Sequence, residues 1–203
     1  MSPRTSTPGD REAAQVPGAP LRADAARNVA QIRAAAIAAF HGRGLDTPLE
    51  EIAAAAGVSK ATIYNRFGGR AGLIDAVIGK LVAAEMYAIM DKALQAADPW
   101  QAIATYVTDR RDLQYREPAF TDALLMAYPD SGQLAAIARA ATDMTTGLVQ
   151  RCHDAGVIRG DFTAGDLYYA DVANGLALRR LPRPARQDYD RRIRFFLDSL
   201  RPR

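Results

Sequence analysis

Residues 47–70 contain the pattern that most constrains the fold, because two helix starts and one helix stop fall within one short segment. Thr47 can cap a helix, and Pro48 suits the first helical position, where its missing N–H group is not needed. Glu50 stands three residues after Thr47, which is the spacing of a capping box. These signals predict a short helix over residues 48–56.

The next signals predict a sharp turn and a second short helix. Gly57 suits the left-handed residue that ends a helix, and Val58 offers a buried anchor after it. Ser59 is a ready N-cap for a helix over residues 60–67. Two short helices joined by so tight a turn pack at a steep angle, so the segment is predicted to be a helix-turn-helix.

The residue types of the second helix fit a function in DNA binding. In a helix-turn-helix this helix lies in the major groove, so one face must anchor it and the other must donate hydrogen bonds. The apolar anchors of the motif are Ile52, Val58, Ile63 and Phe67, for which core packing is a sufficient explanation. The candidate donors are Lys60, Thr62, Tyr64, Asn65 and Arg66.

The distribution of charge agrees with this interpretation. The chain has 26 basic and 23 acidic residues, a net charge of +3 that alone indicates only solubility. Residues 21–70 hold seven of the basic residues and four of the acidic ones, so this segment carries the whole excess. Such a bias is expected where one end of a protein meets phosphate.

The rest of the chain shows apolar spacing typical of helices, and no run alternates convincingly with a period of two. Helices are predicted over residues 25–43, 70–94, 100–115, 119–127, 134–155 and 164–181, with a last one through 189–200. The predicted fold is therefore all-α with about nine helices. Three regions are expected: a disordered tail (1–21), a helix-turn-helix DNA-binding domain (22–70) and a ligand-binding and dimerisation domain (71–203).

The tail contains four prolines and no apolar periodicity, which favours a flexible terminus. An arm that touches DNA through Arg4 and Arg11 is the alternative. The lone Cys152 cannot form an internal disulfide, and with only His41 and His153 in the chain we expect no metal site. We expect no cofactor either.

Several classes of protein are excluded or disfavoured. No stretch reaches the roughly 20 apolar residues of a membrane span, and no signal peptide is evident, so a cytoplasmic location is expected. Glycine-rich phosphate loops, a serine elbow and a His-Glu-x-x-His motif are all missing, so no enzyme is expected. A helical module that dimerises without binding DNA remains the alternative, although it would not need a donor-rich recognition helix.

At residues 47–53 and 56–67 the sequence resembles the TetR family of regulators, and the matching motif covers about 45 residues. The resemblance implies three N-terminal helices followed by a long fourth, a homodimer on a palindromic double-stranded DNA operator, and a small-molecule effector. Looser similarity to the SbtR-like subgroup comes from residues 98–100, 155–161 and 197–202.

The resemblance also implies roles for single residues. Thr47 and Tyr64 would contact phosphate, whereas Lys60, Thr62 and Asn65 would face base edges, beside the capping Ser59. The chain departs from the family at Arg66, where His is frequent, and at Arg70, where Lys is frequent. Both replacements keep a donor, and Arg70 at the start of the fourth helix remains suited to phosphate. Gly72 is a weak helix former where the family often has a better one.

Regulation by a ligand implies a pocket between helices, mostly apolar with a few polar groups. The candidate lining residues are Trp100, Tyr106, Phe120, Met126, Met144, Tyr168 and Asn174, each of which could equally be ordinary core. The last two helices are the candidates for dimerisation, with Leu167, Leu176 and Leu178 on one and Ile193, Phe196, Leu197 and Leu200 on the other. The expected mechanism is repression that a small molecule relieves by shifting the long fourth helix.

Overall fold

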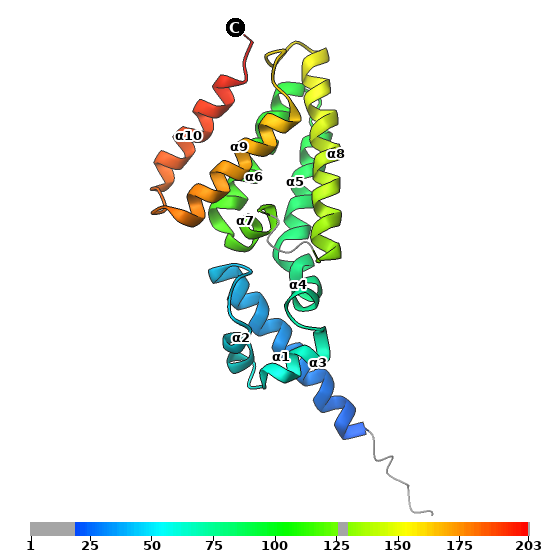
Figure 1. Ribbon diagram of the computed structural model, residues 1–203. Coiled ribbons are helices and arrows are strands. Elements are labelled where there is room, and N and C mark those ends of the chain that lie inside the picture. The colour runs from blue at the N-terminus through cyan, green and yellow to red at the C-terminus, as the bar shows by residue number, and fades with distance from the viewer. Residues whose placement is uncertain (1–18, 126–129, 203) are drawn as a thin grey trace, which may run out of the picture.

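A computed structural model describes residues 19–125 and 130–202 of the chain, and every regular element in those ranges is helical (Figure 1). The all-α prediction is confirmed. The elements are α1 (Ala19–Arg43), α2 (Leu49–Ala55), α3 (Lys60–Phe67), α4 (Arg70–Ile78), the π-helix η1 (Gly79–Ala83), α5 (Ala84–Gln95), α6 (Pro99–Arg116), α7 (Pro118–Leu124), α8 (Gly132–Asp154), α9 (Ala164–Arg180) and α10 (Arg186–Ser199).

Helices α1 to α3 form a small unit at the end of the molecule far from the C-terminus (Figure 1). α1 begins at Ala19, earlier than the expected residue 25, so residues 19–21 of the predicted tail are helical. The rest of the predicted tail, residues 1–18, lies outside the described residues. The core of this unit includes the fully buried side chains of Ile32, Phe40 and Ile63.

The long fourth helix of the prediction is present, but it is not uniform. Its backbone stays helical from Arg70 to Gln95, and residues 79–83 form a π-helical segment between α4 and α5. π segments inside α-helices are rare and occur frequently at functional sites. This composite helix joins the two parts of the molecule, because α4 packs against α3 and α5 packs against α6.

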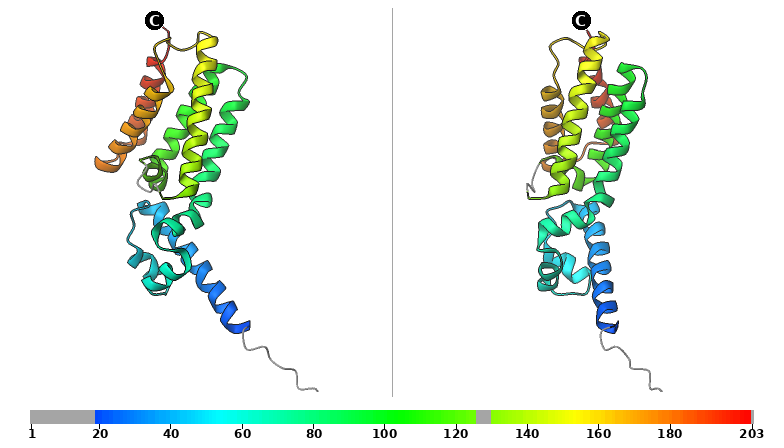
Figure 2. Two further views of the ribbon diagram at one scale, coloured as in Figure 1. Left: turned by 45° about the vertical axis from the view of Figure 1, so that its right-hand side comes forward. Right: turned by 90° about the vertical axis from the view of Figure 1, so that its right-hand side faces the viewer.

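The larger part of the molecule is a bundle built from α5 to α10. In Figure 2, α5 and α8 run side by side, while α9 and α10 cover the other side of α6. Helix α7 is short and lies at the junction with α1, which it contacts. No helix within the described residues is long and apolar enough to span a membrane.

Several helices of the bundle begin with a side-chain cap. The side chains of Asp98 and Ser131 accept hydrogen bonds at the starts of α6 and α8, and Thr163 with Asp166 forms a capping box at the start of α9. The predicted capping box at Thr47 is wrong, because the residue preceding α2 is Pro48 and no side chain caps this helix.

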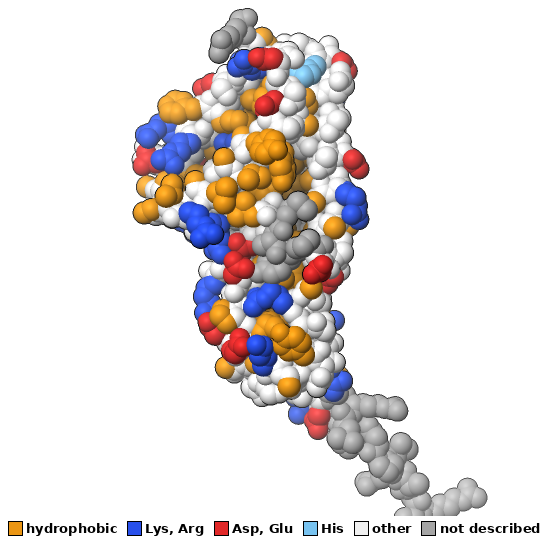
Figure 3. All heavy atoms as spheres, in the orientation of Figure 1, with side chains coloured by type: hydrophobic (Ala, Val, Ile, Leu, Met, Phe, Trp, Pro, Cys, Tyr) orange, Lys and Arg blue, Asp and Glu red, His pale blue; other side chains and the backbone are white. Residues whose placement is uncertain are grey.

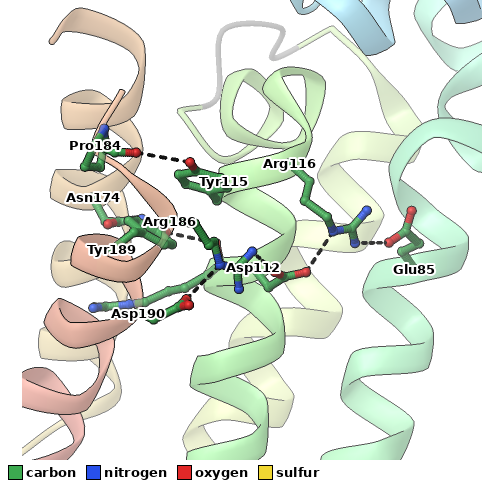
Figure 4. A network of polar contacts seen from close by, with 10 residues as sticks. Glu85, Asp112, Tyr115, Arg116, Asn174, Pro184, Arg186, Tyr189 and Asp190 are labelled. Carbon is green, nitrogen blue, oxygen red and sulfur yellow. Dashed lines mark hydrogen bonds and ion pairs between the residues drawn. The ribbon is translucent and has the colours of Figure 1, made fainter. Parts of the chain in front are cut away.

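Polar side chains also connect the helices of the bundle (Figure 4). Asp112 of α6 pairs with Arg116 at 2.7 Å and with Arg186 of α10 at 2.5 Å, and Arg116 continues to Glu85 of α5 at 2.6 Å. These exposed pairs contribute little each, but together they fix α6 between α5 and α10.

Candidate nucleic-acid interface and effector cavity

Helix α3 is fixed at its start by residues that the sequence analysis singled out. Ser59 Oγ accepts a hydrogen bond of 3.2 Å from the backbone N–H of Thr62 and lies 3.0 Å from its hydroxyl. Gly57, with φ of +66°, makes the turn that precedes it. Ile63 is fully buried, so the opposite face of α3 is directed outward.

The outward face of α3 carries hydrogen-bond donors in solvent. Lys60, Tyr64, Asn65 and Arg66 are exposed, and half of the Tyr64 surface is accessible. Lys60 Nζ lies 2.5 Å from Glu50 of α2 and 5.8 Å from the centre of the Tyr64 ring. The hydrogen bond that Lys60 donates to Glu50 raises the pKa of Lys60, which keeps this side chain charged. The face therefore offers donors and positive charge to an anionic partner.

Two residues that are predicted to contact phosphate form hydrogen bonds within the protein in this structure. Thr47 is buried, and its hydroxyl donates to the carbonyl of Gly44 at 2.9 Å. Arg70 donates from Nη1 to the carbonyls of Leu45 and Thr47, both at 2.7 Å. Arg70 thus connects the start of α4 to the loop before α2, and its contact with phosphate stays a prediction.

The structure explains why residue 72 is a glycine, although glycine is a weak helix former. A Cβ atom at this position would lie 1.7 Å from the carbonyl oxygen of Phe67, at the end of α3. No side chain fits so close to a backbone oxygen, so glycine allows α4 to start directly beside the end of α3. The turn between them uses Gly68 and Gly69, both with positive φ.

The two parts of the molecule meet where α7 contacts the end of α1. His41 Nδ1 is paired with the carboxylate of Glu117, which is buried. Asp122 accepts from the backbone N–H of Leu45 and pairs with Arg179 of α9 at 2.8 Å. Burial raises the pKa of both the Glu117 and the Asp122 carboxyls, although their partners oppose it.

A cavity of about 640 Å³ lies within the bundle, bounded by α5 to α9 and by the end of the π segment. Its walls are mainly apolar, and Arg110 of α6 is a buried cation among them. Apolar lining residues include Val82, Met86, Phe120, Leu134 and Ile137. The size and the lining match those of small-molecule sites in proteins.

Of the predicted lining residues, Phe120 and Tyr168 border this cavity. The others that the structure describes lie elsewhere, and Met126 is outside the described residues. Trp100 packs under Arg201, Tyr106 is fully buried, Met144 packs against the core, and Asn174 donates to Gln114 and Tyr189 (Figure 4).

Sequence reasoning missed Arg110, although a signal was present. Residues Ile103, Tyr106 and Val107 form the buried stripe of α6, and Arg110 follows at the same helical spacing. A basic residue at the next position of an apolar stripe is a candidate buried charge. Its proximity to α7 and α8 could not be read from the sequence, because it depends on the packing of distant segments.

Apolar side chains are exposed on the last two helices and the loop between them. Among the large ones are Tyr169 and Leu176 of α9, Leu181 after it, and Phe195 of α10. The predicted dimer residues Leu167, Ile193 and Leu200 are instead buried within the chain. The hydrophobic surface in Figure 3 extends over the bundle. Within the described residues no cluster of side chains suits a metal ion.

Comparison with known proteins agrees with this geometry. Residues 32–77, which span α2, α3 and parts of α1 and α4, match the family model described as bacterial regulatory proteins, tetR family. Solved structures match over most of the chain. The chain has the TetR fold.

Three of these structures illustrate the similarity. A TetR transcriptional regulator, SCO0520 from Streptomyces coelicolor, is 28% identical and has a TM-score of 0.52, with 85% of this chain and 98% of that chain covered. KstR2, a ketosteroid transcriptional regulator of Mycobacterium tuberculosis, is 17% identical and has a TM-score of 0.62. The match covers 85% of this chain and 94% of that chain.

The third is AibR in complex with isovaleryl coenzyme A and operator DNA, with 15% identity and a TM-score of 0.64. The match covers 86% of this chain and 97% of that chain. At such identities KstR2 and AibR share the TetR fold with this chain and nothing finer. No match was found among the curated proteins.

Proposed function

We propose that this protein is a transcriptional regulator that binds double-stranded DNA through the outward face of α3. The observation that carries the proposal is the exposed set Lys60, Tyr64, Asn65 and Arg66 on a helix whose opposite face is buried. Such a face can enter a major groove and donate to base edges and phosphates. Residues 32–77 also match a family of bacterial regulatory proteins.

A fluorescence-anisotropy titration with the DNA upstream of its own gene tests this function at two salt concentrations. Specific binding should weaken as salt rises, because phosphate contacts release counterions. Lys60→Ala and Tyr64→Phe should both reduce the affinity, and Lys60→Ala should also weaken the preference for the specific fragment, because Lys60 is assigned to base edges.

Lys92→Ala is the matched control, since Lys92 is an exposed cation of α5 that pairs with Asp109 at 2.6 Å and lies far from α3. It should bind DNA like the wild type. Equal losses in both lysine variants would indicate a general charge effect. Failure to prefer any promoter fragment over random DNA would favour a helical module without DNA-binding function.

We further propose that the protein is a homodimer on a palindromic operator, formed through α9 and α10. Exposed large apolar side chains on both helices support this, since such residues mark interfaces when they gather on one face. Two such helices from each protomer can form a four-helix bundle. The two α3 helices of the dimer would then meet two half-sites.

Multi-angle light scattering tests the dimer. Phe195→Glu should shift the mass from dimer to monomer. Leu94→Glu is the control, because Leu94 is similarly exposed but belongs to α5. A wild-type monomer at micromolar concentration, or an unchanged dimer in Phe195→Glu, would contradict the proposed interface.

The cavity is proposed to bind a small-molecule effector that releases the operator, so that the protein acts as a repressor in the cytoplasm. Val82 and Met86 border the cavity and belong to the composite helix whose other end supports α3. A ligand that displaces this helix can change the separation of the two recognition helices. The narrower similarity to SbtR-like regulators stays a prediction.

Distances between spin labels test the mechanism. A spin label is attached to a cysteine introduced by Ala30→Cys, at an exposed position of α1, in a protein that also carries Cys152→Ser. In the dimer, the distance between the two labels reports the separation of the two DNA-binding units. The distance should change when the effector is added. Release of DNA at a constant distance would contradict it.

A further inference from the structure

The cavity offers few hydrogen-bond donors to a ligand. Three threonines of α8 border it, but their hydroxyls already donate to backbone carbonyls of the same helix: Thr142 to Ala138, Thr145 to Ala141 and Thr146 to Thr142. Hydroxyls in this arrangement can accept hydrogen bonds but have no proton left to donate. Arg139 and Asp143 are exposed, carry opposite charges and lie at its rim.

Arg110 differs from the other polar residues that border the cavity, including the exposed Tyr168, because it is both buried and charged. Its side chain is 7% exposed, and its Nη1 lies 2.7 Å from Asp171 Oδ2 and donates to the Tyr106 hydroxyl at 3.1 Å. Its buried Nε has no hydrogen-bond partner within the described residues. Burial opposes the charge, but Asp171 and Tyr106 outweigh this effect and raise the pKa of Arg110, so the guanidinium remains protonated.

The partners of Arg110 do not fully compensate its charge. Asp171 is also shared with Arg111, whose Nε lies 3.4 Å from Oδ1. Arg111 in addition stacks over the ring of Phe196 at 3.9 Å, which stabilises its charge separately. Two buried guanidinium groups thus face a single carboxylate, and the cluster has one positive charge in excess beside an apolar cavity.

We propose that the effector is an apolar molecule with a single anionic group, such as a carboxylate or a sulfonate, and that Arg110 binds this group. The inference rests on the proposed function of the cavity as the effector site. An anion would neutralise the excess charge of the cluster, and charge-assisted hydrogen bonds to a guanidinium are the strong ones. A neutral or cationic ligand of the same shape would leave this charge uncompensated.

Two fluorescent probes with one ring system distinguish the possibilities. 8-Anilinonaphthalene-1-sulfonate carries a sulfonate, and N-phenyl-1-naphthylamine is the same molecule without it. Both become fluorescent in apolar sites. Wild-type protein should bind one sulfonate probe per chain, about tenfold more tightly than the neutral probe, and decanoate should displace it better than decanol.

Substitutions in the cluster predict effects of opposite sign. Arg110→Met should abolish the preference for the sulfonate while it keeps the affinity for the neutral probe. Asp171→Asn should increase the preference, because the carboxylate that competes with the ligand anion for Arg110 is removed. A loosened chain exposes apolar surface and binds several molecules of either probe. An increased ratio of the two affinities at one probe per chain therefore keeps the test valid if Arg110→Met is unstable.

Arg139→Met is the matched control, since Arg139 is an exposed arginine at the rim of the same cavity. It should leave the preference unchanged. Equal affinities for the two probes, or a preference that Arg139→Met removes and Arg110→Met does not, would overturn the assignment to Arg110 while the cavity remains a ligand site. If neither probe binds, the cavity is not the effector site, and the DNA titration then decides separately whether the protein is a regulator.

Discussion

Asp122 of α7 accepts a hydrogen bond of 2.7 Å from the backbone N–H of Leu45, two residues after the end of α1. The other carboxylate oxygen pairs with Arg179 of α9. Gly44 allows this approach, because a Cβ atom there would lie 2.2 Å from the Asp122 carboxylate. Since Phe120 of the same short helix borders the cavity, α7 contacts both the ligand site and the DNA-binding unit.

Asp122→Ala is expected to destabilise the protein by about 1–3 kcal/mol, because it removes both the hydrogen bond from the Leu45 N–H and the ion pair with Arg179. Urea unfolding measures this change. Asp91→Ala, at an exposed position of α5, is the control and should change the stability by less than about 0.5 kcal/mol. Equal stability of the two variants would mean that the Leu45 contact is unimportant.

The same carboxyl predicts a pH dependence. Burial raises the pKa of Asp122 above its ordinary value of 3.8, although the Leu45 N–H and Arg179 oppose this. Between pH 3.8 and the raised pKa the folded state holds a proton that the unfolded chain has lost, so this group's contribution to stability falls as pH rises through that window. Urea midpoints of wild type and Asp122→Asn, measured from pH 3.5 upward, should therefore diverge, with the wild type losing stability relative to the variant. A constant difference would contradict the shift.

A pair of glycines tests the approach of α3 to α4. Gly72→Ala should lower both the stability and the affinity for DNA, because its Cβ would collide with the carbonyl of Phe67. Gly147→Ala in α8 meets nothing within 4 Å and should stabilise the protein by about 0.5–1 kcal/mol. Thermal unfolding and anisotropy measure both effects, and a stabilised Gly72→Ala would refute the steric explanation.

Arg70 has a structural contact and a predicted DNA contact, which two measurements separate. Arg70→Met should lose about 1–3 kcal/mol of stability, since the carbonyls of Leu45 and Thr47 lose their donor. Arg66→Met, at an exposed position of α3, should reduce DNA affinity without that loss. If Arg70→Met leaves the stability unchanged and lowers only the affinity for DNA, the role of Arg70 lies at the phosphate alone.

The thiol of Cys152 is expected to be unreactive in the folded protein. Burial raises its pKa to about 11, and its Sγ lies 3.2 Å from the carbonyl of Pro99. At pH 8 only about one thiol in a thousand would be ionised. Reaction with a disulfide reagent such as DTNB should therefore be slow and should accelerate with urea in proportion to unfolding. A rapid stoichiometric reaction in buffer would contradict the burial.

The sequence predicts the DNA-binding helices well, because their signals are local. Ser59, Gly57 and Ile63 act within a few residues of themselves, and α3 has its predicted bounds. Thr47 was misjudged for the opposite reason, since its hydroxyl is directed to Gly44 by the packing of the loop, and the residue before α2 is Pro48. A capping pattern shows which side chain can cap but does not show where tertiary contacts direct it.

The cavity was the least predictable part, because five helices from distant segments surround it. The spacing of apolar residues contains a signal for the π segment, which the general assignment of a long amphipathic helix does not reveal. The buried residues of the composite helix include a series that recurs every four positions, at Ile74, Ile78, Val82, Met86 and Met90. Four residues of an α-helix exceed one turn by about 40°, so this stripe would wind around a uniform helix, whereas a wider turn keeps it on one side.

The π segment therefore determines how the two ends of the composite helix are rotated relative to each other. If the same five residues closed into ordinary α-helical turns, the register would shift by about one residue and α5 would rotate by about 100° against α4. Val82 and Met86 would then leave the cavity wall while α3 kept its support. The length of this segment, and no particular side chain in it, sets the angular alignment between ligand site and DNA-binding unit.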